Sequence, residues 1–253
     1  MSLTWTDEAV VLSARPHGES ALVVQLLTRA HGRHAGLVQG GQSRRARAHF
    51  QPGTRIAATW RARLAEHLGN LSAEPLGSPL GALLDAPGPL AALASVLALA
   101  ERALPEREPH PACFEGLVAL LDALAGEHWG EATVLWEIQL LAELGFGLDL
   151  SACAATGGND QLVWVSPKSG RAVSASAGEP YRERLLPLPP FLLGRSAGGP
   201  QEVREGLALT GHFLEQGVFL PHHQPLPPAR QRLYARFATE VARQQDSSAP
   251  ESS

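Results

Sequence analysis

The sequence contains very little lysine and very little cysteine. Its basic residues are therefore almost all arginines, and few of its residues could form disulfides. Of its 21 Lys and Arg residues only Lys168 is a lysine, and its only cysteines are Cys113 and Cys153. Two cysteines without a regular spacing argue against a disulfide framework and favour a reducing compartment. The longest apolar run, residues 90–100, is too short to span a bilayer, and the first residues lack the pattern of a signal peptide. We therefore expect a cytoplasmic protein that does not enter a membrane.

Motifs that carry catalysis are also missing. The chain has no glycine-rich phosphate loop ending in Lys-Ser/Thr, no Gly-x-Ser-x-Gly and no His-Glu-x-x-His. Asp149 and Asp160 have no evident partners in the sequence, and the adjacent His222 and His223 have no third ligand near them. We predict no catalytic residue, no cofactor and no metal.

Charge is distributed unevenly along the chain. Residues 1–75 contain nine Arg and five acidic residues, which gives a charge of about +4, whereas the whole chain carries −4. The remaining residues therefore carry about −8. This asymmetry indicates a basic face on the N-terminal part and favours nucleic-acid binding there. Arginine-rich surfaces are also common in chains that simply use Arg in place of Lys, so charge alone does not decide the matter.

The first 78 residues have the pattern of a small β-barrel. Apolar, β-branched runs separated by turn residues predict five short strands, at residues 8–14, 21–27, 31–41, 54–64 and 68–74. Glycines within the third run are typical of the bends that a tightly curled barrel needs. Five strands in this length predict an OB-fold, a barrel that commonly binds oligonucleotides.

The fourth predicted strand alternates between apolar and basic residues. Side chains of a strand point to opposite faces in turn, so one face is predicted to be core and the other basic. The core face comprises Ile56, Ala58, Trp60, Ala62 and Leu64, and the other face comprises Thr59, Arg61 and Arg63.

A loop before this strand is predicted to carry Arg44, Arg45 and Arg47. Arginines beside a barrel can hold phosphates by forked, charge-assisted hydrogen bonds, although a solvated loop would have the same sequence. Only Phe50 and Trp60 stand out here as aromatic residues, and Trp60 is assigned to the core face. The sequence therefore gives little support for base stacking.

From residue 79 the pattern is helical. Apolar residues recur at helical spacing in five segments, at residues 90–104, 112–125, 131–144, 202–216 and 229–244. We predict a helical domain over residues 79–245, and a short polar tail at 246–253 that is disordered. The predicted fold class is α+β.

Residues 151–178 interrupt the helices and have the layout of a zinc ribbon, in which two ligand pairs flank a hairpin. The four ligand positions hold Cys153, Thr156, Ser174 and Ala177. A structural zinc site needs four Cys or His ligands, so we predict that this insert is degenerate, binds no zinc and packs around Trp164.

Several motifs along the chain resemble the RecO family of recombination mediators. They are AVVL at 9–12, GES at 18–20, LT at 27–28, Gly32, GG at 40–41, QPG at 51–53, WRARL at 60–64, LPER at 104–107, WE at 136–137, ELGFGLDL at 143–150, and Cys153 with Gly157. Their order and spacing carry the resemblance, which covers residues 5–240. Many members have four zinc cysteines, and the chain departs from them at Thr156, Ser174 and Ala177.

The resemblance implies a DNA-binding mediator of DNA repair and not an enzyme. Such proteins bind single- and double-stranded DNA, anneal complementary strands and act with RecR. They also bind the acidic, apolar C-terminal tail of single-stranded-DNA-binding protein and help RecA to replace that protein on DNA. The resemblance also places the chain in the cytoplasm, at the nucleoid.

Candidate site residues follow from the local sequence rather than from a matched motif. The candidates for phosphate contacts are Arg33, Arg44, Arg45, Arg47, Arg61 and Arg63. The partner's tail is expected in a pocket between the helices of residues 90–145 and 202–240, near Arg102 or Arg204. The alternative is a protein-interaction scaffold of the repair complex with weak or no DNA binding, and the salt dependence of binding separates the two.

Overall fold

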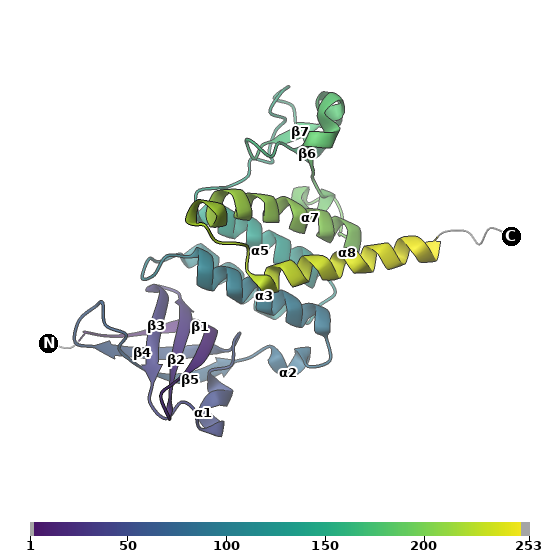
Figure 1. Cartoon of the computed structure of the whole chain (residues 1–253). Coiled ribbons are helices and arrows are strands. Elements are labelled where there is room, and N and C mark those ends of the chain that lie inside the picture. Colours follow the sequence, from purple (N-terminus) through teal and green to yellow (C-terminus); the bar gives the residue numbers. More distant parts are fainter. Residues whose placement is uncertain (1–2, 249–253) are drawn as a thin grey trace. The chain divides into compact units, whose positions relative to one another are not determined.

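The computed structural model describes residues 3–248, apart from the side chains of Arg45 and of residues 246–248 (Figure 1). Contacts divide the chain into two compact units, Met1–Ala125 and Gly126–Ser253, here called the first and the second unit. Each unit is described by itself.

Five strands of the first unit form a closed barrel, as the sequence predicts. They are β1 (Leu3–His17), β2 (Ala21–Thr28), β3 (Gly32–Val38), β4 (Arg55–Ala62) and β5 (Asn70–Gly77), in the order β1-β2-β3-β5-β4. The long β1 pairs with both β2 and β4. The barrel core contains Val11, Val24, Leu26, Ile56 and Phe50.

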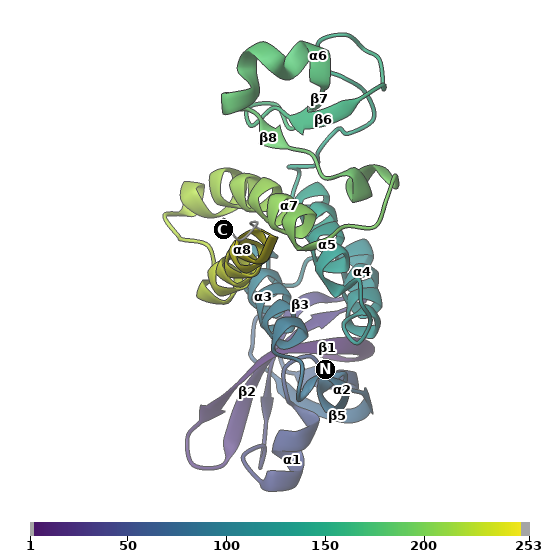
Figure 2. The ribbon, with the colours of Figure 1, turned by 90° about the vertical axis from the view of Figure 1, so that its right-hand side faces the viewer.

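Residues 44–49 form a helix, α1 (Arg44–His49), so the prediction of a loop is wrong. The Oγ of Ser43 accepts a hydrogen bond from the Ala46 backbone N–H and caps the helix, and serine is favoured at this position. The segment lacks the apolar periodicity that reveals most helices. Helix α1 lies at the foot of the barrel in both ribbon views (Figures 1 and 2).

The predicted alternation of the fourth strand is confirmed for Ile56, Ala58 and Trp60, which are buried. It ends sooner than predicted, because β4 stops at Ala62. Arg63 and Leu64 lie in the turn that follows, and Leu64 is 46% exposed. The prediction that these two residues continue the strand faces is therefore wrong.

Three helices complete the first unit: α2 (Leu80–Leu83), α3 (Pro87–Ala103) and α4 (Pro111–Ala123). Helix α3 packs against β1 and β2. The Glu101 carboxylate accepts hydrogen bonds from Ser13 and Arg15, both at 2.9 Å. The change from strands to helices falls near residue 78, whereas the division between compact units falls at 125/126.

The second unit has three main helices, α5 (Trp129–Glu143), α7 (Pro200–Phe213) and α8 (Pro228–Ser248), and α7 packs against the other two. Helix α7 continues as a π-turn, Leu214–Phe219, and a 3-10 turn, Leu220–His222. Helix α8 runs through Ser248, into the segment predicted as a tail, and the rest of that segment lies outside the described residues.

The predicted insert, residues 151–178, forms a small sheet together with the residues that follow it, with three strands in the order β7-β6-β8. The strands are β6 (Leu162–Val165), β7 (Ala172–Ser174) and β8 (Leu186–Pro187). Helix α6 (Ala175–Gly178) and a 3-10 turn at Glu179–Arg184 join β7 to β8, and a second 3-10 turn, Pro190–Leu193, follows β8. Within the second unit the sheet lies beyond α7, on the side away from α8 (Figure 2). Its core includes Cys153, Leu162 and Val165, with Trp164 packed against it.

Candidate nucleic-acid interface

Several arginines of the first unit are bound to acidic side chains of the same unit. Arg55 contacts Glu8 at 2.6 Å and Arg29 contacts it at 2.8 Å. Hydrogen bonds from Arg55, which has the larger effect, and from Arg29 hold the pKa of Glu8 below its ordinary value. Arg29 also pairs with Glu115, so two carboxylates compensate the positive charge of these two arginines.

Arg33, a predicted phosphate contact, also has partners within the first unit. Its Nε donates to the Leu104 carbonyl at 2.8 Å, and its side chain forms an ion pair with Glu106 at 3.1 Å. Only 15% of the side chain is exposed. This geometry ties β3 to the segment after α3 and leaves Arg33 poorly placed for a phosphate.

The other predicted arginines are more available. Arg44, Arg47, Arg61 and Arg63 are exposed, and no carboxylate in the described part of the chain pairs with them. Arg45 lies in the same helix as Arg44, but its side chain is outside the described atoms. Uncompensated cations on one barrel are what phosphate binding requires.

These arginines do not form one continuous ladder. Leu3, at the start of the 15-residue β1, pairs with Ala62, so Arg61 and Arg63 lie near that end of the strand. Helix α1 begins beside the other end of β1, where Gln42 N donates to the Ser20 carbonyl at 2.9 Å. The barrel therefore carries two separate cationic sites.

A groove of about 240 Å³ contains the first of these sites. We call it the basic groove, and its walls include Leu37, Arg61, Arg63, His67, Gly69 and Asn70. Four of its residues, Arg63, His67, Leu68 and Gly69, belong to the loop of residues 63–69 that joins β4 to β5. In OB-folds the loop between strands 4 and 5 commonly flanks the oligonucleotide.

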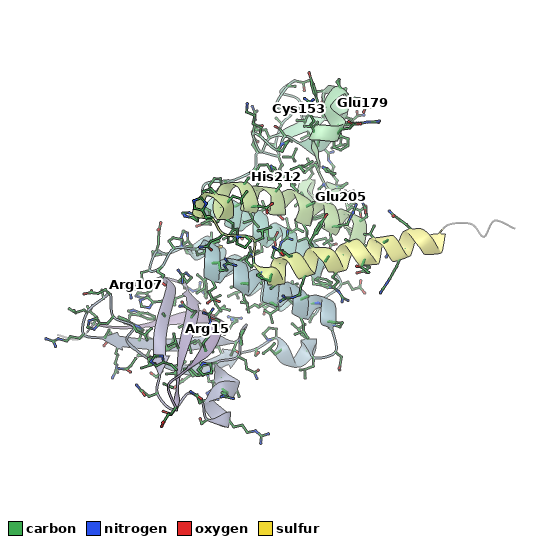
Figure 3. The ribbon with its side chains drawn as sticks, viewed as in Figure 1. Arg15, Arg107, Cys153, Glu179, Glu205 and His212 are labelled. Carbon is green, nitrogen blue, oxygen red and sulfur yellow. The ribbon has the colours of Figure 1, made fainter. Side chains whose placement is uncertain are left out.

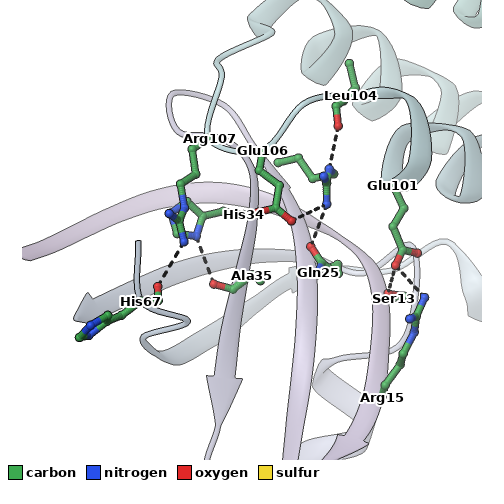
Figure 4. Close-up of polar contacts among 11 residues, drawn as sticks. Ser13, Arg15, Gln25, His34, Ala35, His67, Glu101, Leu104, Glu106 and Arg107 are labelled. Atoms are coloured by element: carbon green, nitrogen blue, oxygen red, sulfur yellow. Dashed lines mark hydrogen bonds and ion pairs between the residues drawn. The ribbon is translucent and has the colours of Figure 1, made fainter. Parts of the chain in front are cut away.

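Arg107 also lies at this end of the barrel, although it was not among the predicted site residues (Figure 3). Its backbone N–H donates to the Arg33 carbonyl at 2.8 Å, and its guanidinium donates to the His67 carbonyl at 3.3 Å (Figure 4). Its φ of 62° is in the left-handed region, which costs a non-glycine residue energy. The loop after α3 thus holds a cation against the 63–69 loop.

Beside Arg107 lies a hollow of about 400 Å³, here called the aromatic pocket. Its lining includes Leu3, Trp5, His31, His34, Trp60, Ala65 and Arg107. The rings of His31 and Trp5 are stacked at 4.3 Å, and those of Trp5 and Trp60 at 5.6 Å. The sequence indicated Phe50 and Trp60 as the aromatic residues of this region and missed Trp5, because the register that pairs Trp5 with Trp60 across β1 and β4 cannot be read from composition.

Polar contacts fix the rings of the aromatic pocket. His31 Nδ1 contacts the Asp7 carboxylate at 2.9 Å, and Trp60 Nε1 donates to the Leu68 carbonyl at 2.9 Å. Burial lowers the pKa of His34, and the nearby charge of Arg107 acts in the same direction. The lowered pKa favours the neutral form of the His34 ring.

Gly32 allows the loop after α3 to approach the barrel. A Cβ at Gly32 would lie 2.0 Å from the Glu108 carbonyl oxygen, and its φ is +68°. Gly32→Ala should lower the free energy of unfolding by more than the roughly 1–2 kcal/mol that a left-handed alanine costs. Gly18→Ala is the matched control, since Gly18 has φ +58° with nothing within 4 Å of its Cβ. Equal denaturation midpoints for the two variants would disprove the close approach.

The predicted tail pocket draws on helices that belong to different units. Arg102 is in α3 of the first unit and Arg204 in α7 of the second. Within the second unit, α7 and α8 border a groove of about 390 Å³, here called the helix groove. Its lining includes Leu207, Ala208, Gly211, Leu226, Arg230 and Tyr234.

Arg230, in the helix groove, is not a free cation. Its side chain is 2% exposed and contacts the fully buried Glu137 carboxylate at 2.5 and 3.0 Å. It also donates to the Leu207 carbonyl at 2.6 Å. Arg204 lies one turn before Ala208 on the same face of α7. Its Nε is buried without a hydrogen-bond partner among the described residues.

The positions of the zinc-ribbon ligands do not fit zinc. Cys153, which packs in the core beside the small sheet (Figure 3), receives a hydrogen bond from the Ser174 backbone N–H at 3.3 Å. Hydrogen bonds with Ser174 and then Thr156 lower the pKa of the Cys153 thiol to about 6. The other three positions supply two hydroxyls and a methyl group, whereas structural zinc needs four Cys or His ligands. Among the side chains that the structure describes, no group of three or more His, Cys, Asp or Glu is suited to a metal.

The purified protein should contain no stoichiometric zinc, and a chelator should leave its melting temperature unchanged, because one thiolate cannot hold the ion. Elemental analysis and thermal melts measure both. The matched variant restores the ligands with Thr156→Cys, Ser174→Cys and Ala177→Cys, and should bind zinc and become sensitive to chelator. One zinc per parent chain would contradict this.

Among the described helices, none has the length and apolar character needed to cross a membrane.

Two family models match the chain: Recombination protein O N terminal over residues 1–79 and Recombination protein O C terminal over residues 87–225. The chain is 60% identical over 237 residues to the DNA repair protein RecO of Rhodospirillum centenum, covering 93% of this chain and 95% of that protein. It is 52% identical over 238 residues to that of Phenylobacterium zucineum, covering 93% and 98%. It is 51% identical over 240 residues to that of Caulobacter vibrioides strain CB 15, covering 94% and 96%.

Proposed function

Since this chain belongs to the RecO family of DNA repair proteins, we propose that it is a non-enzymatic recombination mediator that binds and anneals DNA through its barrel. The observation that carries the proposal is the basic groove, where Arg61 and Arg63 are exposed at the end of β4 and pair with no carboxylate of the described residues. Barrels of this kind commonly bind oligonucleotides with the loop that follows strand 4.

Charge neutralisation alone is enough for this activity. A cation that contacts a phosphate releases condensed counterions, and this release drives binding to any sequence. Annealing requires two strands to be held near each other while their mutual repulsion is reduced. The separation of the basic groove from α1 supports this role, because one barrel then offers each strand a cationic site.

The partners follow from the same proposal. We place the protein at the nucleoid of the cytoplasm, acting with RecR and helping RecA to replace single-stranded-DNA-binding protein on DNA. The acidic, apolar tail of that protein would bind to the helix groove, with its apolar end against Leu207 and its acidic part near Arg204. Amphipathic peptides commonly bind in such grooves between helices.

Arg204→Ala should weaken binding of the tail peptide roughly tenfold, since a hydrogen bond to a charged group contributes about 1.5–3 kcal/mol. Removing the terminal apolar residue of the peptide should also weaken binding. Peptide titration by fluorescence anisotropy measures both. Arg236→Ala, at an exposed position of α8, is the matched control. If the parent protein binds the shortened peptide as tightly as the full one, the groove is not the site.

Two measurements test the function as a whole. Binding to single-stranded and duplex oligonucleotides should fall steeply as salt rises, because released counterions must be taken up again. The protein should also accelerate annealing of complementary oligonucleotides coated with single-stranded-DNA-binding protein. If it binds the partner proteins but neither binds nor anneals DNA, it is a scaffold, and the proposal is wrong.

A further inference from the structure

We propose that the aromatic pocket holds one unpaired nucleobase, so that the protein engages single-stranded DNA by stacking as well as by charge. The inference rests on the proposed DNA-binding function and assigns it a substrate class. A base needs flat aromatic surface, room for one ring system, and cations placed for the phosphates on either side of it.

The flat surface is a stack of three rings. Trp5 is parallel to His31 within 11° and to Trp60 within 13°. Trp60, at one end of the stack, is 2% exposed, whereas the side chain of His31, at the other end, is 35% exposed. Because the ring of His31 is accessible, another aromatic ring can stack on it.

The hollow beside the stack suits a small, flat, neutral group. Its volume of about 400 Å³ lies in the range of small-ligand pockets, about 300–1,000 Å³. Asp7, which faces His31, is occupied by contacts to the His31 ring and to the Ala30 backbone N–H at 2.7 Å. Its side chain is 8% exposed, so it presents little negative charge to a ligand.

Arginines lie on both sides of the aromatic pocket, where the DNA backbone of a bound nucleotide would enter and leave it. Arg107 lines the aromatic pocket itself. The 63–69 loop lies between this pocket and the basic groove, because Ala65 lines the first and His67 and Gly69 line the second. A base in the aromatic pocket would therefore place its neighbouring phosphates within reach of Arg107 on one side and Arg61 or Arg63 on the other.

This arrangement favours single strands. A base in a duplex is paired and stacked inside the helix, so it cannot enter the hollow without being extruded. Phosphate contacts at the basic groove and α1 remain open to both kinds of DNA. Single strands therefore gain a contact that duplexes lack.

The test compares an oligothymidylate with an oligomer of equal length whose central nucleotides are abasic, together with a duplex. The parent protein should bind the oligothymidylate about tenfold more tightly than the abasic oligomer. His31→Ala and Trp5→Ala should each remove most of this difference and leave duplex affinity unchanged. Trp5→Phe should retain it, and Tyr181→Ala, 60% exposed in the second unit, should have no effect.

If Trp5→Ala fails to fold, His31→Ala and the abasic comparison with the parent protein still decide the matter. Equal affinity for the two oligomers, at a normal salt slope, would overturn the pocket while the proposed function stands. Failure to bind any DNA would overturn both. Loss of binding to an apolar peptide, with DNA affinity unchanged in His31→Ala, would assign the pocket to a protein partner instead.

Discussion

Arg230→Met should destabilise the second unit by about 3–5 kcal/mol, the range for removing one member of a buried ion pair. The Glu137 carboxylate is fully buried, and Arg230 supplies two of its hydrogen bonds, at 2.5 and 3.0 Å. Without the guanidinium, a charge would remain in an apolar interior, with Thr210 as its remaining hydrogen-bond partner among the described residues. Denaturant unfolding followed by circular dichroism measures the loss.

Two variants make this result specific. Arg232→Met removes a charge from an exposed position of the same helix and should change stability by less than about 0.5 kcal/mol. The double variant Glu137→Leu with Arg230→Met should recover much of the loss, because no charge is then buried. If Arg230→Met is no less stable than Arg232→Met, the ion pair does not hold α5 and α8 to α7.

Replacing Arg61 and Arg63 together by Ala should weaken DNA binding roughly 25- to 60-fold more at 0.1 M than at 1 M salt. Each lost phosphate contact lowers the salt slope by about 0.7 for single strands and 0.9 for duplex, so the plot should flatten by about 1.4 and 1.8. Titrations at several salt concentrations measure this slope. Stability should change little, since both side chains are exposed.

A charge-matched control is Arg182→Ala with Arg184→Ala, in an exposed turn of the second unit. It should leave the slope unchanged. The triple variant with Arg44, Arg45 and Arg47 replaced by Ala tests α1, and should flatten the slope by about 2.1 for single strands and about 2.7 for duplex. If one of these barrel variants keeps the salt slope of the parent protein, its arginines do not contact DNA. The other cationic site must then account for binding.

The sequence predicted those features that depend only on neighbouring residues, such as the alternation of side chains along a strand. Ile56, Ala58 and Trp60 alternate because side chains of a strand do, whatever lies elsewhere in the chain. Helix α1 was missed because its exposed arginines leave no apolar stripe, although Ser43 at its start was a usable signal for a helix N-cap.

Long-range contacts account for what the sequence did not reveal. In the sequence Arg33 has no evident partner. In the structure it contacts Leu104 and Glu106, which are more than 70 residues away along the chain. The aromatic pocket needs Trp5, His31 and Trp60 to meet, and only the strand register of β1 brings the first and last together. A set of arginines can thus be chosen from sequence, but which of them remain available depends on the packed barrel.

The segment after α3 is joined to the barrel largely through main-chain atoms: the carbonyls of Leu104 and Arg33, the N–H of Arg107, and the backbone of Glu108 against Gly32. Main-chain contacts depend on the number of residues between two anchors and much less on which side chains they carry. Insertions and deletions in residues 104–108 should therefore be far less tolerated in evolution than substitutions. Loop length, more than loop identity, should be what natural variation in this protein preserves.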